Sequence, residues 1–309
     1  MNKLMRNKEL RLLLTQNCNY DCVFCSHEGL NSKPKQKLGI DDYTYLYTVC
    51  RDNFDWRNIT LTGGEPLLYK DFDELVTRIA KQQGRITVVS NGYLLHKHTD
   101  TVDLLKRINL SLHSLDEEKY NAIIQNKNKL PRVISNIINT RANSPHVDVR
   151  LNVVLTKDFN DSQEEIKRLL DFIDLTGCSL KFIELANDKD KVIPLDEIKQ
   201  KLNILGVKER THDNRSIVMS DNVFLTRTSC ETAQIAKDPE STCREAMDFF
   251  IAPNGIVNHC VVNNSEDSIL HEIKIRDSEK LVGKLSKLSE SFAANCVYAK
   301  SNHKDICKE

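Results

Sequence analysis

The sequence predicts an α/β fold built on a parallel sheet, and two observations predict it. Up to about residue 186, short apolar runs rich in Ile, Val and Leu alternate with helical patterns. Runs that are almost continuously hydrophobic are typical of strands covered on both faces, as in parallel sheets. Six candidate strands are too few for a full eight-strand barrel, so we expect a barrel-like or open sheet over residues 1–186. The alternation stops near residue 187, which predicts a separate C-terminal region over residues 187–309.

The individual elements follow from local patterns. The candidate strands are residues 9–14, 58–61, 85–90, 107–112, 147–154 and 180–185. Capping signals predict two helices between them, one from Asp71 to Gly84 and one from Asp161 to Gly177. The expected buried faces are Phe72, Leu75, Val76 and Ile79 in the first helix and Ile166, Leu169, Leu170 and Ile173 in the second.

The C-terminal region has three recognisable elements. "LDEIKQKLNILG" predicts a short helix, and Asn254-Gly255 between apolar runs predicts a tight hairpin. The last element is an amphipathic helix, and its apolar positions are Leu281, Leu285, Leu288 and Phe292.

Composition and charge exclude several classes of protein. Lys plus Arg equals Asp plus Glu, 44 against 44, so no overall field attracts nucleic acid or an anionic membrane. The first residues lack the apolar core of a secretory signal, and no apolar run is long enough to cross a membrane. We therefore expect a cytosolic protein without nucleic-acid or membrane partners.

The ten cysteines need an explanation in a reducing compartment. Cys50 and Cys178 stand alone and are expected to be small buried apolar residues. Cys18, Cys22 and Cys25 have the spacing C-x3-C-x2-C, directly after the first strand. Clustered thiolates are soft ligands for an iron–sulfur cluster or for zinc. A structural zinc site needs four ligands, which His27 could complete, whereas a four-iron cluster held by three cysteines leaves one iron open for a substrate or cofactor.

Polar or glycine-rich stretches follow each of the first four strands. They are the cysteine loop, "TGGEPLL" with Gly63, Gly64, Glu65 and Pro66, "SNGYLL" with Ser90 and Asn91, and "SLHSL" with Ser111. The carboxyl ends of parallel strands lie at one edge of a sheet, so we expect the four stretches to converge there. Paired glycines permit close approach of a ligand, and Glu65 is suited to accept hydrogen bonds from an ammonium group.

This combination resembles the radical S-adenosylmethionine (SAM) enzymes. The likeness rests on the three cysteines with Phe24 before the last, "TGGEPLL" and "SNGYLL". The resemblance implies a partial (β/α)6 barrel in which Cys18, Cys22 and Cys25 hold a [4Fe–4S] cluster. It also implies that the open iron binds SAM and that an electron splits SAM to a 5′-deoxyadenosyl radical, which abstracts a substrate hydrogen. A flavodoxin or ferredoxin is the kind of electron donor that such an enzyme needs.

The resemblance also implies roles for the other stretches. The "GGEP" stretch around Glu65 would bind the methionine amine. Ser90, Asn91 and Ser111 lie where the family contacts the carboxylate and ribose of SAM.

Within the superfamily, the sequence is most similar to the GTP 3′,8-cyclase group of molybdenum-cofactor synthesis. "RINLSLHSLDEEKYNAI" and "KFIEL" extend the likeness over most of residues 10–186. Those cyclases hold a second cluster with three C-terminal cysteines, and the auxiliary-cluster domains called SPASM and twitch open with similar spacing. Cys230, Cys243 and Cys260 would match them, with Cys296 or Cys307 as a fourth ligand. Unrelated thiols are the alternative.

Departures from the cyclases bear on the substrate. Twelve residues separate Cys230 from Cys243, "CREAMDFF" has a single arginine, and "NHKDICKE" lacks the cyclases' glycine pair. The expected substrate is therefore a small-molecule or peptide precursor of a natural product, such as a nucleoside or sugar. GTP cyclisation is the alternative, and a non-enzymatic zinc or iron–sulfur protein is the second alternative.

Overall fold

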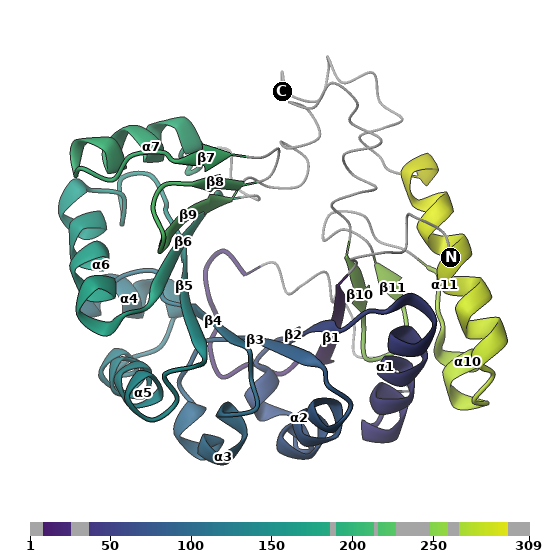
Figure 1. Ribbon diagram of the computed structural model, residues 1–309. Coiled ribbons are helices and arrows are strands. Elements are labelled where there is room, and N and C mark those ends of the chain that lie inside the picture. The colour runs from purple at the N-terminus through teal and green to yellow at the C-terminus, as the bar shows by residue number, and fades with distance from the viewer. Residues whose placement is uncertain are drawn as a thin grey trace. The chain divides into compact units, whose positions relative to one another are not determined.

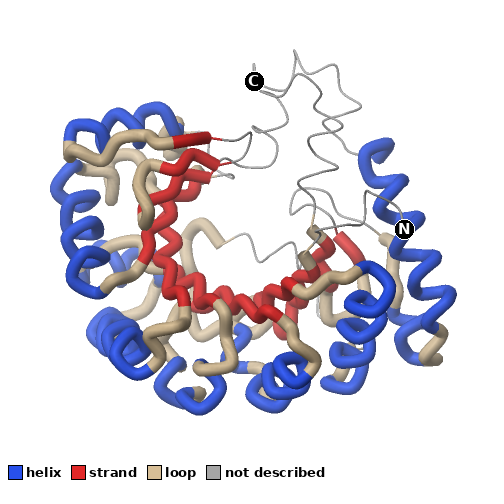
Figure 2. Tube along the Cα trace, in the orientation of Figure 1, coloured by secondary structure: helices blue, strands red, loops and turns tan. Residues whose placement is uncertain are grey.

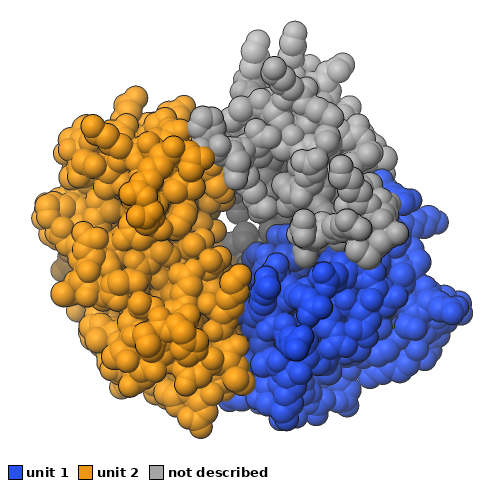
Figure 3. All heavy atoms as spheres, viewed as in Figure 1, with its two compact units in different colours: residues 1–17, 27–87, 229–309 blue, residues 18–26, 88–228 orange. Residues whose placement is uncertain are grey.

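The structure is a computed structural model that describes residues 9–25, 37–185, 190–212, 216–226, 248–258 and 266–295, except the side chains of residues 291–295. The chain forms two compact units, blue and orange in Figure 3. Unit 1 consists of Met1–Asn17, His27–Thr87 and Ser229–Glu309. Unit 2 consists of Cys18–Ser26 and Val88–Thr228. The cysteine loop therefore belongs to unit 2, although the strand that leads into it belongs to unit 1.

Unit 1 is built around β1 (Leu10–Thr15). This strand pairs in parallel with β2 (Asn58–Gly63) on one side and with β10 (Phe249–Ile251) on the other. The strand β11 (Val257–Asn258) pairs antiparallel with β10, which confirms the hairpin predicted at Asn254-Gly255. The helices of the unit are α1 (Ile40–Phe54), η3 (Pro66–Leu68), α2 (Phe72–Lys81), α10 (Leu270–Lys274) and α11 (Ser278–Asn295). Leu281, Leu285 and Leu288 of α11 are buried, as predicted.

Unit 2 contains a sheet with the strand order β4-β5-β6-β9-β8-β7. The strands are β4 (Arg107–Ser111), β5 (Asp148–Val154), β6 (Ser179–Ile183), β7 (Thr211–His212), β8 (Ser216–Val218) and β9 (Val223–Thr226), and β3 (Arg85–Ser90) crosses the unit boundary. The first four strands in that order are parallel, and β8 and β7 follow antiparallel. The helices are η4 (Leu95–Lys97), α3 (Thr99–Val102), α4 (Glu117–Ile124), α5 (Leu130–Asn143), α6 (Gln163–Thr176) and α7 (Leu195–Ile204).

The two faces of the unit 2 sheet differ in polarity. Helices α5 and α6 cover one face (Figures 1 and 2), where Val149, Leu151 and Val153 of β5 are fully buried. The alternate residues of β5, Arg150 and Asn152, are half-buried on the opposite face. Their neighbours in the register are polar as well, because Asn109 aligns with Arg150, Ser111 with Asn152, and Asn152 with Lys181. We call the residues Asn109, Ser111, Arg150, Asn152 and Lys181 the polar face.

The structure confirms the predicted strands and most of the predicted helix faces, and it corrects some helix ends. In α6, Ile166, Leu169 and Ile173 are buried as predicted, but Leu170 is only half-buried. Phe72, Leu75, Val76 and Ile79 are the buried residues of α2, but this helix ends at Lys81 and not near Gly84, and the side chain of Asp71 makes no capping hydrogen bond. The N-cap of α6 is Ser162, not Asp161, because the hydroxyl of Ser162 accepts the Glu165 N–H. Asp161 instead pairs with Lys201 of α7.

The sequence did not predict that the sheet continues past residue 186. Strand β9 extends the parallel sheet from β6, and β10 adds a parallel strand beside β1. The boundary between residues 186 and 187 stays a prediction. Among the described residues, no helix is both long and apolar enough to cross a membrane.

Candidate functional site

Three thiols lie on one loop of unit 2. Cys18 and Cys25 are exposed and Cys22 is half-buried, and all three lie outside disulfides. The Cys25 N–H donates to the Cys22 carbonyl at 3.0 Å, which closes a turn between these two residues. The Tyr20 N–H approaches the Cys18 Sγ at 3.4 Å, so the loop's own backbone supplies a donor to this sulfur.

The end of α4 holds the backbone of the cysteine loop. The N–H groups of Asp21 and Val23 donate to the carbonyls of Ile124 and Ile123, at 3.1 and 3.0 Å. The last carbonyls of a helix have no partner within the helix, so this loop satisfies them. The side chain of Asn126 adds a third tie, because its Nδ2 donates to the Asn19 carbonyl at 3.2 Å.

His113 supports the loop from the other end of the β4–α4 segment. Its ring meets the ring of Phe24 edge to face, with the centroids 4.8 Å apart. The Val154 N–H donates to His113 Nδ1 at 3.2 Å, which assigns the ring hydrogen to Nε2. Burial lowers the pKa of His113 to about 4, so the ring beside Phe24 is neutral at pH 7.

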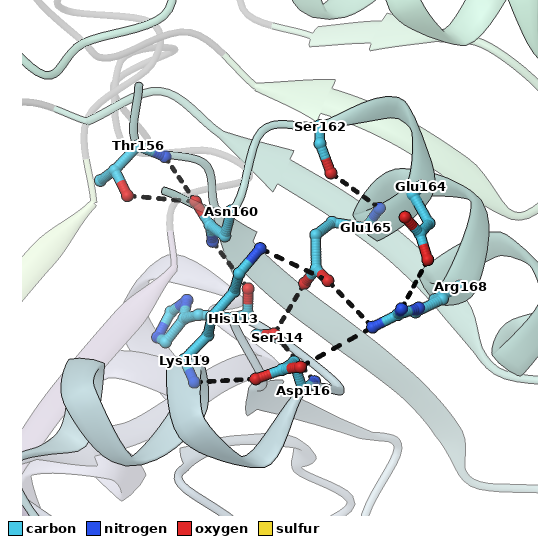
Figure 4. Close-up of polar contacts among 10 residues, drawn as sticks. All are labelled: His113, Ser114, Asp116, Lys119, Thr156, Asn160, Ser162, Glu164, Glu165 and Arg168. Atoms are coloured by element: carbon cyan, nitrogen blue, oxygen red, sulfur yellow. Dashed lines mark hydrogen bonds and ion pairs between the residues drawn. The ribbon is translucent and has the colours of Figure 1, made fainter. Parts of the chain in front are cut away.

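A buried polar network fixes the loops around His113 (Figure 4). Asn160 donates from Nδ2 to the His113 carbonyl at 2.7 Å and accepts the Thr156 N–H at 2.7 Å. Ser114 Oγ donates to Glu165 Oε2 at 2.8 Å, and the other oxygen of Glu165 accepts from Arg168 at 3.2 Å. The network joins the loop after β4 to the start of α6, so hydrogen bonds from two elements hold the backbone around His113.

The protonation of the three thiols depends on burial and on their mutual repulsion. Burial, followed by the charges of Cys25, Cys18 and Asp21, raises the pKa of Cys22 to about 12. Thiolates at these positions repel one another, and a bound cationic centre would remove this repulsion and displace the protons. Among the described residues, no three His, Cys, Asp or Glu side chains are arranged around a single ion. An iron–sulfur cluster instead spreads its thiolates over different irons, so three neighbouring soft donors on one loop fit such a group.

The "SNG" stretch lies against the cysteine loop. Asn91 is buried, and its Nδ2 donates to Asn19 Oδ1 at 2.7 Å and lies 4.0 Å from Cys18 Sγ. Ser90 Oγ accepts the Gly92 N–H at 2.9 Å, and Asn136 of α5 donates to the Gly92 carbonyl at 2.8 Å. This turn is therefore fixed on both sides and holds Asn91 beside the first cysteine.

The "GGEP" stretch lies in unit 1 and packs on the last residues of β1. A shift in the β1–β2 register aligns Thr15 with Gly63, whose φ is 127°. A Cβ atom at Gly63 would lie 2.5 Å from the Thr15 carbonyl oxygen, and one at Gly64 would lie 2.4 Å from that of Asn17. Only glycine permits this approach. The Glu65 N–H donates to the Asn17 carbonyl at 2.8 Å, so "GGEP" fixes the backbone that leads into Cys18.

Glu65 itself is fully buried. Its Oε1 accepts the Leu67 N–H at 3.1 Å and so caps η3, with Pro66 in the first turn. A carboxylate can accept several hydrogen bonds, so this cap and an ammonium ligand are compatible roles.

The polar face of unit 2 has acceptors without partners. Asn109 Oδ1 and Asn152 Oδ1 are buried atoms that accept no hydrogen bond from any residue that the structure describes. Arg150 lies opposite Asn109 in the register and two residues before Asn152 on β5. It donates to Ser179 Oγ at 3.1 Å, pairs with Asp148 at 3.6 Å, and stacks 4.4 Å from the centroid of Phe224. Buried acceptors normally have donors, so this face is suited to a ligand with N–H or O–H groups.

The structure brings together part of the predicted site. Within unit 2, Cys18 lies beside Asn91, Phe24 of the same loop meets His113, and Ser111 ends the strand that leads to His113. The convergence with "GGEP" stays a prediction, because that stretch belongs to the other unit. Cys230, Cys243, Cys260, Cys296 and Cys307 lie outside the described residues, as does His27. Cys50 and Cys178 are buried, as predicted.

Sequence reasoning missed the supports of the loop. The sequence indicated His113 only as a member of "SLHSL", and nothing in it indicated the contact with Phe24. Asn160 and Glu165 follow a different strand, 47 and 51 residues away from their partners, and no local pattern links them.

The comparisons with known proteins agree with this geometry. One relative, "Probable GTP 3′,8-cyclase" of Pyrobaculum aerophilum, is 28% identical over 293 residues, which cover 89% of this chain and 90% of the relative. The "GTP 3′,8-cyclase" of Aquifex aeolicus is 36% identical over 212 residues, 64% of this chain and 65% of that protein. The structure of Streptococcus suis SuiB bound to S-adenosylmethionine has a TM-score of 0.66 at 19% identity, over 90% of this chain and 67% of that chain. This likeness confirms the partial barrel as the fold.

The family itself is shown by a direct match. Residues 12–173, more than half of the chain, match the radical SAM superfamily. The match includes the cysteine loop, "GGEP", "SNG" and "SLHS". The chain is therefore an enzyme that belongs to the radical SAM superfamily.

Proposed function

We propose that Cys18, Cys22 and Cys25 hold a [4Fe–4S] cluster and that the chain abstracts a hydrogen atom from a polar substrate. The observation behind this proposal is that three cysteines lie on one loop whose backbone is hydrogen-bonded to the end of α4. Two of the three thiols are exposed, and Asn91 Nδ2 lies 4.0 Å from the sulfur of Cys18. When bound, the cluster supplies the electron that cleaves SAM to the radical. Glu65 would bind the methionine amine, and Ser90, Asn91 and Ser111 would contact the carboxylate and ribose. The reduced thiols of this loop fit a cytosolic setting.

The polar face indicates the kind of substrate. Asn109 and Asn152 offer buried acceptors, and the guanidinium of Arg150, which pairs with Asp148, keeps this face polar, so a substrate with several N–H or O–H groups is favoured over a hydrocarbon. A nucleoside, a sugar or a peptide has such groups.

GTP is the first substrate to test. The relatives named GTP 3′,8-cyclase align over 64% and 89% of this chain, which favours cyclisation of GTP. Another nucleoside, sugar or peptide precursor is the second candidate. Its support is the sequence of residues 243–250, "CREAMDFF", which has one arginine where the cyclases are arginine-rich.

The test is anaerobic reconstitution followed by turnover. We expect about four iron atoms per chain from the first cluster, or about eight with a second cluster, and formation of 5′-deoxyadenosine from SAM under dithionite. Stoichiometric zinc without iron would refute the proposal. Conversion of GTP to a cyclised product decides for the first candidate, whereas SAM cleavage that GTP does not affect decides for the second.

A C-terminal auxiliary cluster is also proposed. Cys230, Cys243 and Cys260 are its expected ligands, with Cys296 or Cys307 as the fourth. Cys260→Ala should lower the iron content by about half and keep part of the SAM cleavage. Unchanged iron content would remove Cys260 from the ligand set.

A further inference from the structure

A basic segment runs from within α4 to just past the end of α5. Residues 119–147 include Lys119, Lys127, Lys129, Arg132 and Arg141 and no Asp or Glu, in a chain whose charges balance overall. We call Lys127, Lys129 and Arg132 the 127–132 patch. Lys127 and Arg132 are exposed and Lys129 is half-buried. Three positive charges thus occur within a stretch of six residues, 127–132.

The patch has no internal counter-charge. In the part of the chain that the structure describes, none of its three cations takes part in an ion pair, whereas Arg168 of α6 pairs with Glu164 at 2.6 Å. Lys129 instead lies over the ring of Tyr93, with its Nζ 4.5 Å from the centroid. The charge of the patch is therefore available to a partner.

The patch is attached directly to the cysteine loop. Ile124 and Asn126, which precede it, bind the backbone of Asp21 and Asn19. The ring of Tyr93 under Lys129 packs against that of Tyr20, with centroids 6.4 Å apart. The patch and the three thiols thus belong to one continuous surface of unit 2.

The loop adds an apolar contact to this surface. Val23, between Cys22 and Cys25, is 63% exposed. Cys18 and Cys25 are exposed as well. An apolar centre with a charged rim is typical of protein interfaces, and transient redox complexes are small ones.

We propose that the 127–132 patch, with Val23, is the docking surface for an acidic one-electron donor protein of the flavodoxin type. This inference rests on the proposed function, since reductive cleavage of SAM needs one external electron for each event. In the docked complex the donor loses one electron and the centre held by the cysteines gains it, and no bond is made or broken. Positive charge beside the loop would raise the rate of productive encounter with an acidic donor.

The test compares two triple variants. The patch variant combines Lys127→Glu, Lys129→Glu and Arg132→Glu. The control combines Lys81→Glu, Arg85→Glu and Lys106→Glu, which reverses three exposed cations near the amino ends of β3 and β4. Reduced flavodoxin and dithionite are used in turn as the electron source for 5′-deoxyadenosine formation. Binding of flavodoxin is measured separately by fluorescence anisotropy, on reconstituted and on cluster-free chain.

We expect a selective loss in the patch variant. At low salt its kcat/KM for flavodoxin and its affinity for flavodoxin should each fall by about tenfold or more, with a weaker dependence on salt, while turnover with dithionite stays the same. The control should match the wild type in every arm. The double variant Lys127→Glu, Arg132→Glu keeps the contact of Lys129 with Tyr93 and should show an intermediate loss.

Several outcomes would overturn the inference. An equal loss with dithionite would mean that the patch supports the fold or the site, and an equal loss in the control would mean that only overall charge matters. Patch-dependent binding of an oligonucleotide with unchanged binding of flavodoxin would assign the surface to nucleic acid. If the wild type cleaves no SAM with dithionite, the proposed function fails, and the cluster-free binding assay still decides the docking surface.

Discussion

The cysteine loop and the "GGEP" turn each come at the end of a strand, β1 and β2, but different interactions fix their backbones. The cysteine loop, residues 18–25, exposes two of its three thiols and takes its shape from hydrogen bonds to the end of α4. The "GGEP" turn, residues 63–66, buries its one charged side chain and takes its shape from glycines against the backbone of Thr15 and Asn17.

The contrast separates two kinds of requirement. The loop must present side-chain atoms to a ligand, so its residue types matter and its backbone is supported from outside. The turn must bring backbone close to backbone, so side chains are excluded from it. Substitutions in the loop should therefore affect chemistry first, and substitutions in the turn should affect the fold first.

The strongest test of this difference is Cys22→Ser. The trio has no spare ligand, so we expect 5′-deoxyadenosine formation to fall by about three orders of magnitude or more, together with the iron of the first cluster. The unfolding midpoint of the cluster-free chain should stay close to that of the wild type, because Cys22 is only half-buried and serine has nearly the same size. Cys178→Ala is the matched control and should keep its iron and its turnover. Retained SAM cleavage in Cys22→Ser would contradict the ligand assignment.

Gly63→Ala should show the opposite behaviour. Its φ of 127° is strained for alanine, and the new Cβ would lie 2.5 Å from the Thr15 carbonyl oxygen. We expect the free energy of unfolding of the cluster-free chain to fall by about 2–4 kcal/mol. Urea unfolding measures it, and Gly283→Ala is the control because a Cβ there meets no atom within 4 Å. Equal stability of the two variants would refute the close approach.

Glu65→Gln divides the two roles of the buried carboxylate. Glutamine keeps an oxygen that can accept the Leu67 N–H, so the cap of η3 and the unfolding midpoint should be preserved. The loss of the negative charge should weaken SAM binding by about 10- to 100-fold, as expected for a hydrogen bond to a charged group. Equilibrium binding of SAM to the reconstituted protein measures this effect. Unchanged affinity would leave Glu65 with the cap alone.

The difference between the two regions also explains what the sequence predicted. The spacing of Cys18, Cys22 and Cys25 and the pair Gly63-Gly64 are local patterns, because ligand number and close backbone approach require particular residues at fixed positions. The strands before them were equally readable, since buried strands of a parallel sheet are continuously apolar. The family, the fold and the candidate ligands followed from these signals.

The supports could not be predicted, because they depend on pairs that are distant in sequence. Phe24 meets His113, and His113 is held by Asn160, which follows another strand. The parallel pairing of β10 with β1 joins segments more than two hundred residues apart. A single sequence gives the type of each residue but not which residues meet, and short strands such as β9 have little pattern of their own.

His113 connects the cysteine loop to the rest of unit 2, because it contacts Phe24 and is held by Asn160. Its contribution to the free energy of unfolding should depend on pH. Burial lowers the pKa of His113 to about 4, against about 6.5 in an unfolded chain. The unfolded state therefore binds a proton between these values and the folded state does not, so stability is complete above pH 6.5 and falls as the pH drops toward 4. We expect this group to reduce the free energy of unfolding by about 2 kcal/mol at pH 5 relative to pH 7, as urea unfolding of the cluster-free chain would show.

Two variants of His113 separate its titration from its contacts. His113→Phe keeps a ring against Phe24 but loses the acceptor for the Val154 N–H, whereas His113→Asn keeps an acceptor and loses the ring. Neither side chain titrates in this range, so in both variants the free energy of unfolding should no longer fall by about 2 kcal/mol between pH 7 and pH 5. At pH 7 each variant should be about 1 kcal/mol less stable than the wild type, because one contact is missing. Hydrogen exchange of residues 18–25 should increase more in His113→Asn, because the ring is the contact that reaches the loop. If both variants still lose about 2 kcal/mol of stability between pH 7 and pH 5, the pH dependence belongs to other groups and His113 is only a packing residue.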